Sequence, residues 1–151
     1  MTQSGKYEPS SNSILQAAKR NNISTMKILI DSCESIEYFM HVMQERSDEG
    51  YNSLHYAVIR GSLEMMQLLI KSGVDWGQRT KTGKNILHLA VENGKLEIVA
   101  KIFSLCNNDA LINLANDKHS GIPNPLDNAI QSDKRKIVDL LREKGLKETK
   151  D

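Results

Sequence analysis

Histidine and cysteine are the side chains of this sequence best suited to metal binding or nucleophilic catalysis, and it has four histidines and two cysteines. His41 and His119 belong to no cysteine and histidine pattern typical of a zinc site. His55 and His88 stand 33 residues apart in two matching Leu-His-x-Ala segments. This spacing makes them parts of a repeat, so we predict no metal site and no cofactor.

The remaining catalytic patterns are also missing from the sequence. It contains no glycine-rich phosphate loop, no G-x-S-x-G turn and no convincing carboxylate pair. Cys33 and Cys106 are too few for a disulfide framework. We therefore predict free, buried or half-buried thiols and a protein that is not an enzyme and takes no small-molecule substrate.

The composition limits the kinds of partner and the cellular compartment that we expect for this protein. A net charge of +1 over 151 residues gives no field that would favour nucleic acid or a membrane surface. No window is long and apolar enough to span a bilayer, and residues 1–13 lack the apolar core of a signal peptide. We expect a cytoplasmic protein without membrane insertion or direct nucleic-acid binding.

A repeat of 33 residues organises the chain. Gly50-Tyr51-Asn52-Ser53-Leu54-His55-Tyr56-Ala57 matches Gly83-Lys84-Asn85-Ile86-Leu87-His88-Leu89-Ala90, and the matches continue to Gly61 and Gly94. Weaker copies flank this pair, so that leucine anchors fall at Leu15, Leu54, Leu87 and Leu126. The spacings of 39, 33 and 39 residues predict about six extra residues in each of repeats one and three.

This pattern resembles the ankyrin family, whose unit reads G-x-T-P-L-H-x-A, then G-x-L-E, then an apolar helix. The resemblance implies an all-α ankyrin-repeat solenoid of stacked helix-turn-helix units with projecting turns. It also implies that His55 and His88 bond to neighbouring turn backbone. The expected boundaries are a polar tail over 1–12, a repeat domain over 13–146 (repeats 13–49, 50–82, 83–120 and 121–146) and a C-terminal tail over 147–151.

The two insertions have different patterns. Ile36, Phe39, Met40 and Met43 recur at helical spacing and predict a short extra helix, which either covers the edge of the core or binds a partner. The second insertion, over 106–120, is polar and rich in asparagine, which predicts a loop.

The resemblance also implies where a partner protein would bind, namely on a concave face made of turn tips and exposed first-helix positions. The matching residues are Glu49, Tyr51, Ile59 and Arg60 in repeat two, Lys81, Lys84, Glu92 and Asn93 in repeat three, and Arg20, Asn21, Gln131 and Ser132 in the end repeats. Trp76 either packs between repeats or serves as an aromatic anchor for the partner.

A narrower resemblance concerns the segment from Thr82 to Asn93 and the stretched link after its repeat, which resemble the inhibitors of NF-κB (IκB proteins) and their short viral mimics. It implies inhibition of a Rel-type transcription factor, in the cytoplasm or the nucleus. The alternatives are an adaptor, a bacterial effector that binds another protein in the host cytoplasm, and a regulatory or substrate-recruiting subunit of an enzyme.

Overall fold

The fold is all-α, as predicted. The computed structural model describes residues 11–116 and 122–148, which form ten α-helices and no strand. Two compact units divide the chain, Met1–Asp75 and Trp76–Asp151. None of the described helices has the length and hydrophobicity that a membrane span requires.

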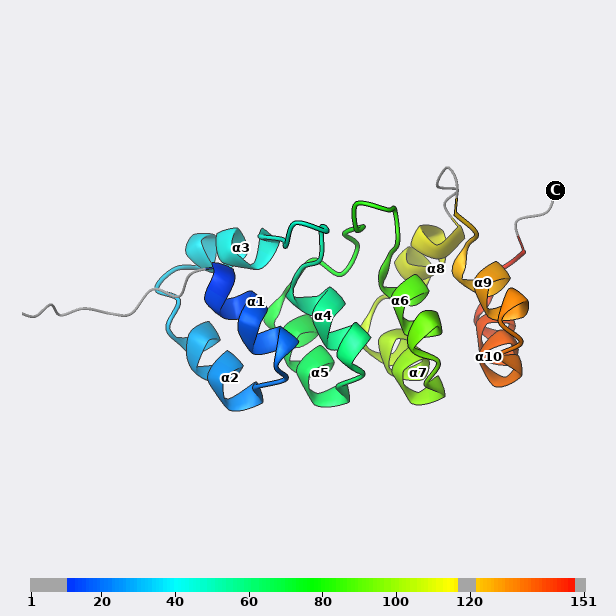
Figure 1. The fold of residues 1–151 in the computed structure, drawn as a ribbon, viewed down its shortest axis with the longest axis horizontal. Helices are drawn as coiled ribbons and strands as arrows, with labels where there is room; N and C mark the ends of the chain where they lie inside the picture. Colours follow the sequence, from blue (N-terminus) through cyan, green and yellow to red (C-terminus); the bar gives the residue numbers. More distant parts are fainter. Residues whose placement is uncertain (1–10, 117–121, 149–151) are drawn as a thin grey trace, which may run out of the picture. The chain divides into compact units, whose positions relative to one another are not determined.

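The first unit consists of two helix pairs and one additional helix. The two first helices pack against each other, as do the two second helices, and the additional helix packs against the first helix of the unit (Figure 1). In chain order, the helices are α1 (Ser11–Lys19), α2 (Ile23–Asp31), α3 (Ile36–Gln44), α4 (Ser53–Arg60) and α5 (Leu63–Ser72).

The second unit also consists of two helix pairs and one additional helix. The first helices α6 and α9 pack together, the second helices α7 and α10 pack together, and α8 packs against α7. The bounds are α6 (Ile86–Asn93), α7 (Leu96–Leu105), α8 (Asn108–Asn116), α9 (Pro125–Gln131) and α10 (Arg135–Lys144).

Apolar residues at helical spacing build the core of each unit. Leu54 and Ala57 of α4, and Met65 and Leu69 of α5, are all 0% exposed. They recur at i, i+3 or i+4, which places them on one face of each short helix. Burying a side chain as large as leucine or methionine contributes about 1.5–3 kcal/mol. Because helices this short are marginal alone, packing must supply most of their stability.

The structure corrects the register of the first repeat. Ile14 is 1% exposed and takes the place of buried Leu54, whereas Leu15 is only half-buried. Asn21, at φ 55°, follows α1 as Gly61, at φ 78°, follows α4. Both pairs are 40 residues apart, not 39. Two adjacent apolar residues, Ile14 and Leu15, left the register ambiguous, and the choice of leucine was wrong.

With this register, the two units repeat each other. Cys33 and Cys106 are 73 residues apart, and each follows the second helix of its unit. In the later helix pair, Leu54 and Leu126 are 72 residues apart. The two units therefore share one order of five helices, although the additional helix packs against the first helix α1 in one unit and against the second helix α7 in the other.

One of the two insertions was predicted correctly. The first insertion forms helix α3. Its Phe39 and Met43 are buried, so this helix covers the edge of the core. The second was predicted as a loop, and this is wrong over α8. Asn107 caps this helix by accepting the N–H of Ala110 at 2.9 Å, and Leu111 and Ala115 bury one face at i, i+4 spacing. The asparagines act as a cap and as solvated positions, which a composition argument cannot distinguish from a loop.

Candidate functional site

His88 is bonded to the backbone on both sides of its ring. Its Nδ1 accepts the N–H of Asn85 at 3.0 Å, while Asn85 Oδ1 accepts the N–H of His88 at 2.9 Å. Because Nδ1 accepts, the proton of the neutral ring is on Nε2. That nitrogen lies 2.8 Å from the carbonyl oxygen of Pro123, in the link before α9, and donates to it. The prediction that this histidine bonds to neighbouring turn backbone is confirmed.

His55 makes the same reciprocal pair at the start of α4. Its Nδ1 accepts the N–H of Asn52 at 2.9 Å, and Asn52 Oδ1 accepts the N–H of His55 at 2.8 Å. Both side chains are buried. Helices α4 and α6 thereby both satisfy backbone donors that would otherwise be left without partners at their N-termini.

Burial shifts the titration of His88. Loss of hydration lowers its pKa below the ordinary value of 6.5, and nearby Arg79 and Lys84 lower it further. The hydrogen bond to Pro123 and the charge of Glu92 act in the opposite direction and are weaker than burial. The neutral ring is therefore the folded form, in agreement with its hydrogen bonds.

Among the described residues, the other candidates for chemistry do not assemble into a metal site. His41 is exposed, and His119 lies outside the described residues. Within residues 11–116 and 122–148, no three histidine, cysteine or carboxylate side chains gather as metal ligands would.

The two cysteines take a structural position. Each stands 19 residues after the buried anchor of its repeat, where Gly73 and Gly145 stand in the other repeats. Both are free thiols, Cys33 half-buried and Cys106 buried. Burial raises the pKa of Cys106 to about 12. A thiol with this pKa is a poor nucleophile at neutral pH.

Tight turns precede the first helices α4 and α6. In the earlier turn, the N–H of Ser47 donates to the carbonyl of Tyr51 at 2.8 Å, and the N–H of Gly50 donates back to Ser47 at 2.9 Å. The turn over 80–84 has the same two bonds. Gly50 has φ 85°, which explains the glycine at this position. The structurally equivalent tip residues are Asp48 and Lys81, of opposite charge.

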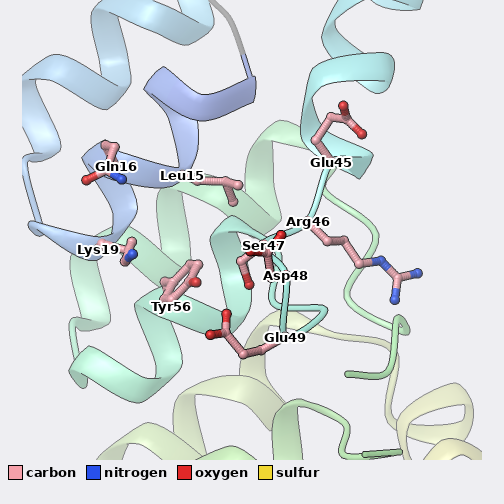
Figure 2. Close-up of a pocket in the computed structure, with 9 residues that line it drawn as sticks. All are labelled: Leu15, Gln16, Lys19, Glu45, Arg46, Ser47, Asp48, Glu49 and Tyr56. Carbon is pink, nitrogen blue, oxygen red and sulfur yellow. The ribbon is translucent and has the colours of Figure 1, made fainter. Parts of the chain in front are cut away.

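A groove of about 530 Å³ lies within the first unit, between the first helices α1 and α4 and the turn that follows α3 (Figure 2). Helix α1 and helix α4 form one side, and the turn over 45–49 forms the other. The residues that line it are Leu15, Gln16, Lys19, Glu45, Arg46, Ser47, Asp48, Glu49 and Tyr56.

Aromatic contacts fix the helix side of this groove. Tyr56 meets Tyr51 edge-on at 5.5 Å between ring centroids, and Tyr51 meets His55 at 6.1 Å. The ammonium group of Lys19 lies 5.2 Å from the centroid of Tyr56, within the range of a cation–π interaction. The groove is therefore tied to the capped start of α4 by a chain of ring contacts.

A family model described as ankyrin repeats (three copies) matches residues 4–80. That range is half of the chain. The chain belongs to the ankyrin-repeat family. A search of curated proteins found no match, and no relative supports the narrower resemblance to the inhibitors of NF-κB.

The predicted partner-binding residues of ankyrin repeat two all lie in the first unit, in three kinds of surroundings. Glu49 lines the groove, and Tyr51 is half-buried in contact with Tyr56, another lining residue. Ile59 is 43% exposed. Arg60 donates from Nη1 to the carbonyl oxygen of Lys19 at 3.1 Å, so it also holds the C-terminal end of α1.

The corresponding residues of ankyrin repeat three lie in the second unit. Lys84 and Glu92 form an ion pair of 2.8 Å with each other. Lys81 is exposed at the tip of its turn, and Asn93 is half-buried. Trp76 is half-buried too, which leaves both interpretations of this residue open.

Sequence reasoning missed much of the groove, above all Lys19, Tyr56 and Asp48. With the corrected register, Lys19 occupies the position of Ile59 in the next ankyrin repeat, so the correct alignment would have found it. Asp48 is the equivalent of Lys81 once the turn bonds are matched. Tyr56 follows His55 directly, and no pattern in the sequence marked it.

Proposed function

We propose that this chain is a non-catalytic module that binds a partner protein through the groove of its first unit. Its family supports this, because ankyrin repeats are generally protein-interaction modules and typically have no catalytic role. The observation that carries the proposal is the groove itself, about 530 Å³ in volume and lined by side chains of the first helices and of the turn over 45–49.

The surface around the groove supports this proposal. Asp48, Glu49 and Lys19 are exposed, and Ile59 is an apolar side chain that is 43% exposed on the same helix as Tyr56. A mixture of aromatic, apolar and charged groups is typical of a protein interface with a polar rim. A nucleic-acid site would instead require uniform positive charge.

We propose further that the equivalent positions of the second unit take part in binding. Lys81 is exposed, the Lys84–Glu92 pair remains partly accessible, and Asn93 and Trp76 are half-buried. The residues of the two units are the same positions of successive ankyrin repeats, and this equivalence supports a role in binding for each unit.

Site-specific photo-cross-linking tests the location. Benzoylphenylalanine in place of Gln16 would report on the groove, and in place of Lys71, exposed on the second helix α5, on the outer surface of the same unit. We expect one cross-linked protein in cell extract from the groove position and little from Lys71. Equal or stronger cross-linking from Lys71 would contradict the proposal, because it would place the binding surface on the second helices.

The identity of the partner is a separate proposal. The resemblance of the segment from Thr82 to Asn93 to inhibitors of NF-κB favours a Rel-type transcription factor. Calorimetry with a purified Rel homology domain tests it directly. Saturable binding that is weakened by Tyr56→Ala would support this partner. Absence of binding, together with a different protein in the cross-linking experiment, would favour the adaptor, effector or enzyme-subunit alternatives.

A further inference from the structure

The groove of the first unit has two sides of different chemistry. The helix wall consists of Leu15, Gln16, Lys19 and Tyr56, and it offers apolar surface, an amide and one cation. The turn wall is the segment 45–49, which carries three carboxylates, those of Glu45, Asp48 and Glu49, and one cation, Arg46. A segment that enters the groove therefore meets an aromatic and aliphatic surface on one side and a net negative charge on the other.

The cation of the helix wall lies over an aromatic ring, whereas the carboxylates of the turn wall have no ion-pair partner among the residues that the structure describes. Lys19 places its ammonium group over the ring of Tyr56, at 5.2 Å. Glu45, Asp48 and Glu49 are exposed and form no ion pair with any of the described residues. In Figure 2, Glu49 points from the turn toward Tyr56, and Arg46 points away from the helix wall.

We infer that the groove receives a positively charged segment of the partner protein, in which at least one arginine or lysine reaches the turn wall. The aliphatic stem of such a side chain fits against Leu15 and Tyr56, while its charged end approaches the carboxylates. This inference rests on the proposed function and adds the charge of the occupant to it. Attraction between opposite charges would also speed association and weaken with added salt.

An acidic segment is the opposite reading, and the charges disfavour it. Lys19 is the single cation of the helix wall, and its ammonium group lies over Tyr56. An incoming carboxylate would have to approach Lys19 while facing the turn wall, where three carboxylates outnumber the one cation, Arg46, and where Glu49 points toward Tyr56. This net negative charge makes an acidic occupant the less stable one.

Three matched peptides test the inference. The probes are acetyl-Ser-Gly-Arg-Leu-Arg-Gly-Ser-amide, a second peptide with glutamine in place of both arginines, and a third with glutamate there. Each is titrated into the full-length chain labelled with ¹⁵N, at low and at high salt. We expect the arginine peptide to shift the amide signals of Gln16, Lys19, Tyr56 and residues 45–49, and to bind at least about tenfold more tightly than the glutamate peptide.

Charge variants separate this groove from general electrostatic attraction. The triple variant Glu45→Gln, Asp48→Asn, Glu49→Gln should weaken binding of the arginine peptide about tenfold. The control variant Glu64→Gln, Glu97→Gln, Glu143→Gln removes the same charge at exposed sites outside the groove and should change it less than twofold. Lys19→Gln should leave this binding unchanged or strengthen it, whereas the acidic reading requires that it weaken.

The outcomes distinguish a failure of the inferred charge from a failure of the proposed binding surface. If the glutamine or glutamate peptide shifts the same signals as strongly as the arginine peptide, the groove binds protein segments but the inferred charge is wrong. Equal losses in the groove and control variants would overturn the inference as well. If photo-cross-linking finds a partner elsewhere on the chain, the proposed function fails at this surface whatever the peptides do.

Discussion

His88 connects two repeats of the second unit, because its Nε2 donates to the carbonyl oxygen of Pro123 at 2.8 Å while its Nδ1 receives the N–H of Asn85 at 3.0 Å. One buried ring thus satisfies a donor at the start of α6 and an acceptor in the link before α9. The ring has no free nitrogen to offer to a ligand.

Replacement of His88 should therefore affect stability. We expect His88→Ala to lower the free energy of unfolding by about 1–3 kcal/mol, since it leaves buried backbone groups without partners. Urea denaturation followed by circular dichroism measures the change. His41→Ala, at an exposed position, is the control and should be nearly neutral. A stable His88→Ala protein that had lost affinity for a metal ion would contradict the structural role.

The lowered pKa of His88 predicts a dependence on pH. Between the folded pKa and the ordinary value of 6.5, the unfolded chain binds more protons than the folded one. The contribution of this histidine is therefore fully present above about pH 6.5 and is lost as the pH falls through the unfolded and then the folded pKa. Melting temperatures of the wild type and His88→Ala should converge between pH 7.5 and pH 5. A difference that grows on acidification would refute this assignment.

Ile59 and Arg60 should have separable effects, although both were predicted to bind the partner. Ile59→Ser should weaken partner binding by about 1–2 kcal/mol if this side chain is part of a hot spot, with no change in melting temperature. Arg60→Ala should lower stability by about 1 kcal/mol, because Arg60 donates to the carbonyl of Lys19. Calorimetry and thermal melts on both variants test this. A double replacement would confuse the two effects.

Cys33 and Cys106 should react with thiol reagents at very different rates. Cys33 is half-buried, whereas Cys106 is 7% exposed and has a pKa raised to about 12. Labelling of the native chain with iodoacetamide at pH 8, followed by peptide mass spectrometry, should modify Cys33 first. In urea both should react at similar rates. Preferential labelling of Cys106 in the native chain would show that α7 opens locally in solution.

The strong repeats were predictable because one local pattern encodes each element. Asn52 and His55 sit three residues apart, as a capping pair must, and Gly73 marks the end of a second helix at φ 101°. The first repeat was harder, since Asn21 takes the left-handed conformation that glycine usually fills and so hides the boundary of α1.

The groove was only partly predictable for a different reason. Its turn wall follows helix α3, and periodicity matches the tip of this turn, Asp48, to Lys81 without showing that the turn faces helices α1 and α4. The ion pair between Lys84 and Glu92 also depends on the directions of the two side chains, which a repeat pattern does not predict. A sequence pattern identifies the exposed positions, but only coordinates show which of them face a common space.

The recurrence of one order of five helices suggests that the gene grew by tandem duplication of a two-repeat block, after which the copies diverged at the surface. The buried anchors stayed apolar, whereas the residue equivalent to Lys19 became Glu92 and the one equivalent to Tyr56 became Asn128. Paralogous halves that share a scaffold and differ in exposed chemistry are free to specialise. A partner that recognises the charge of Lys19 would meet a carboxylate, Glu92, at the equivalent position of the second half.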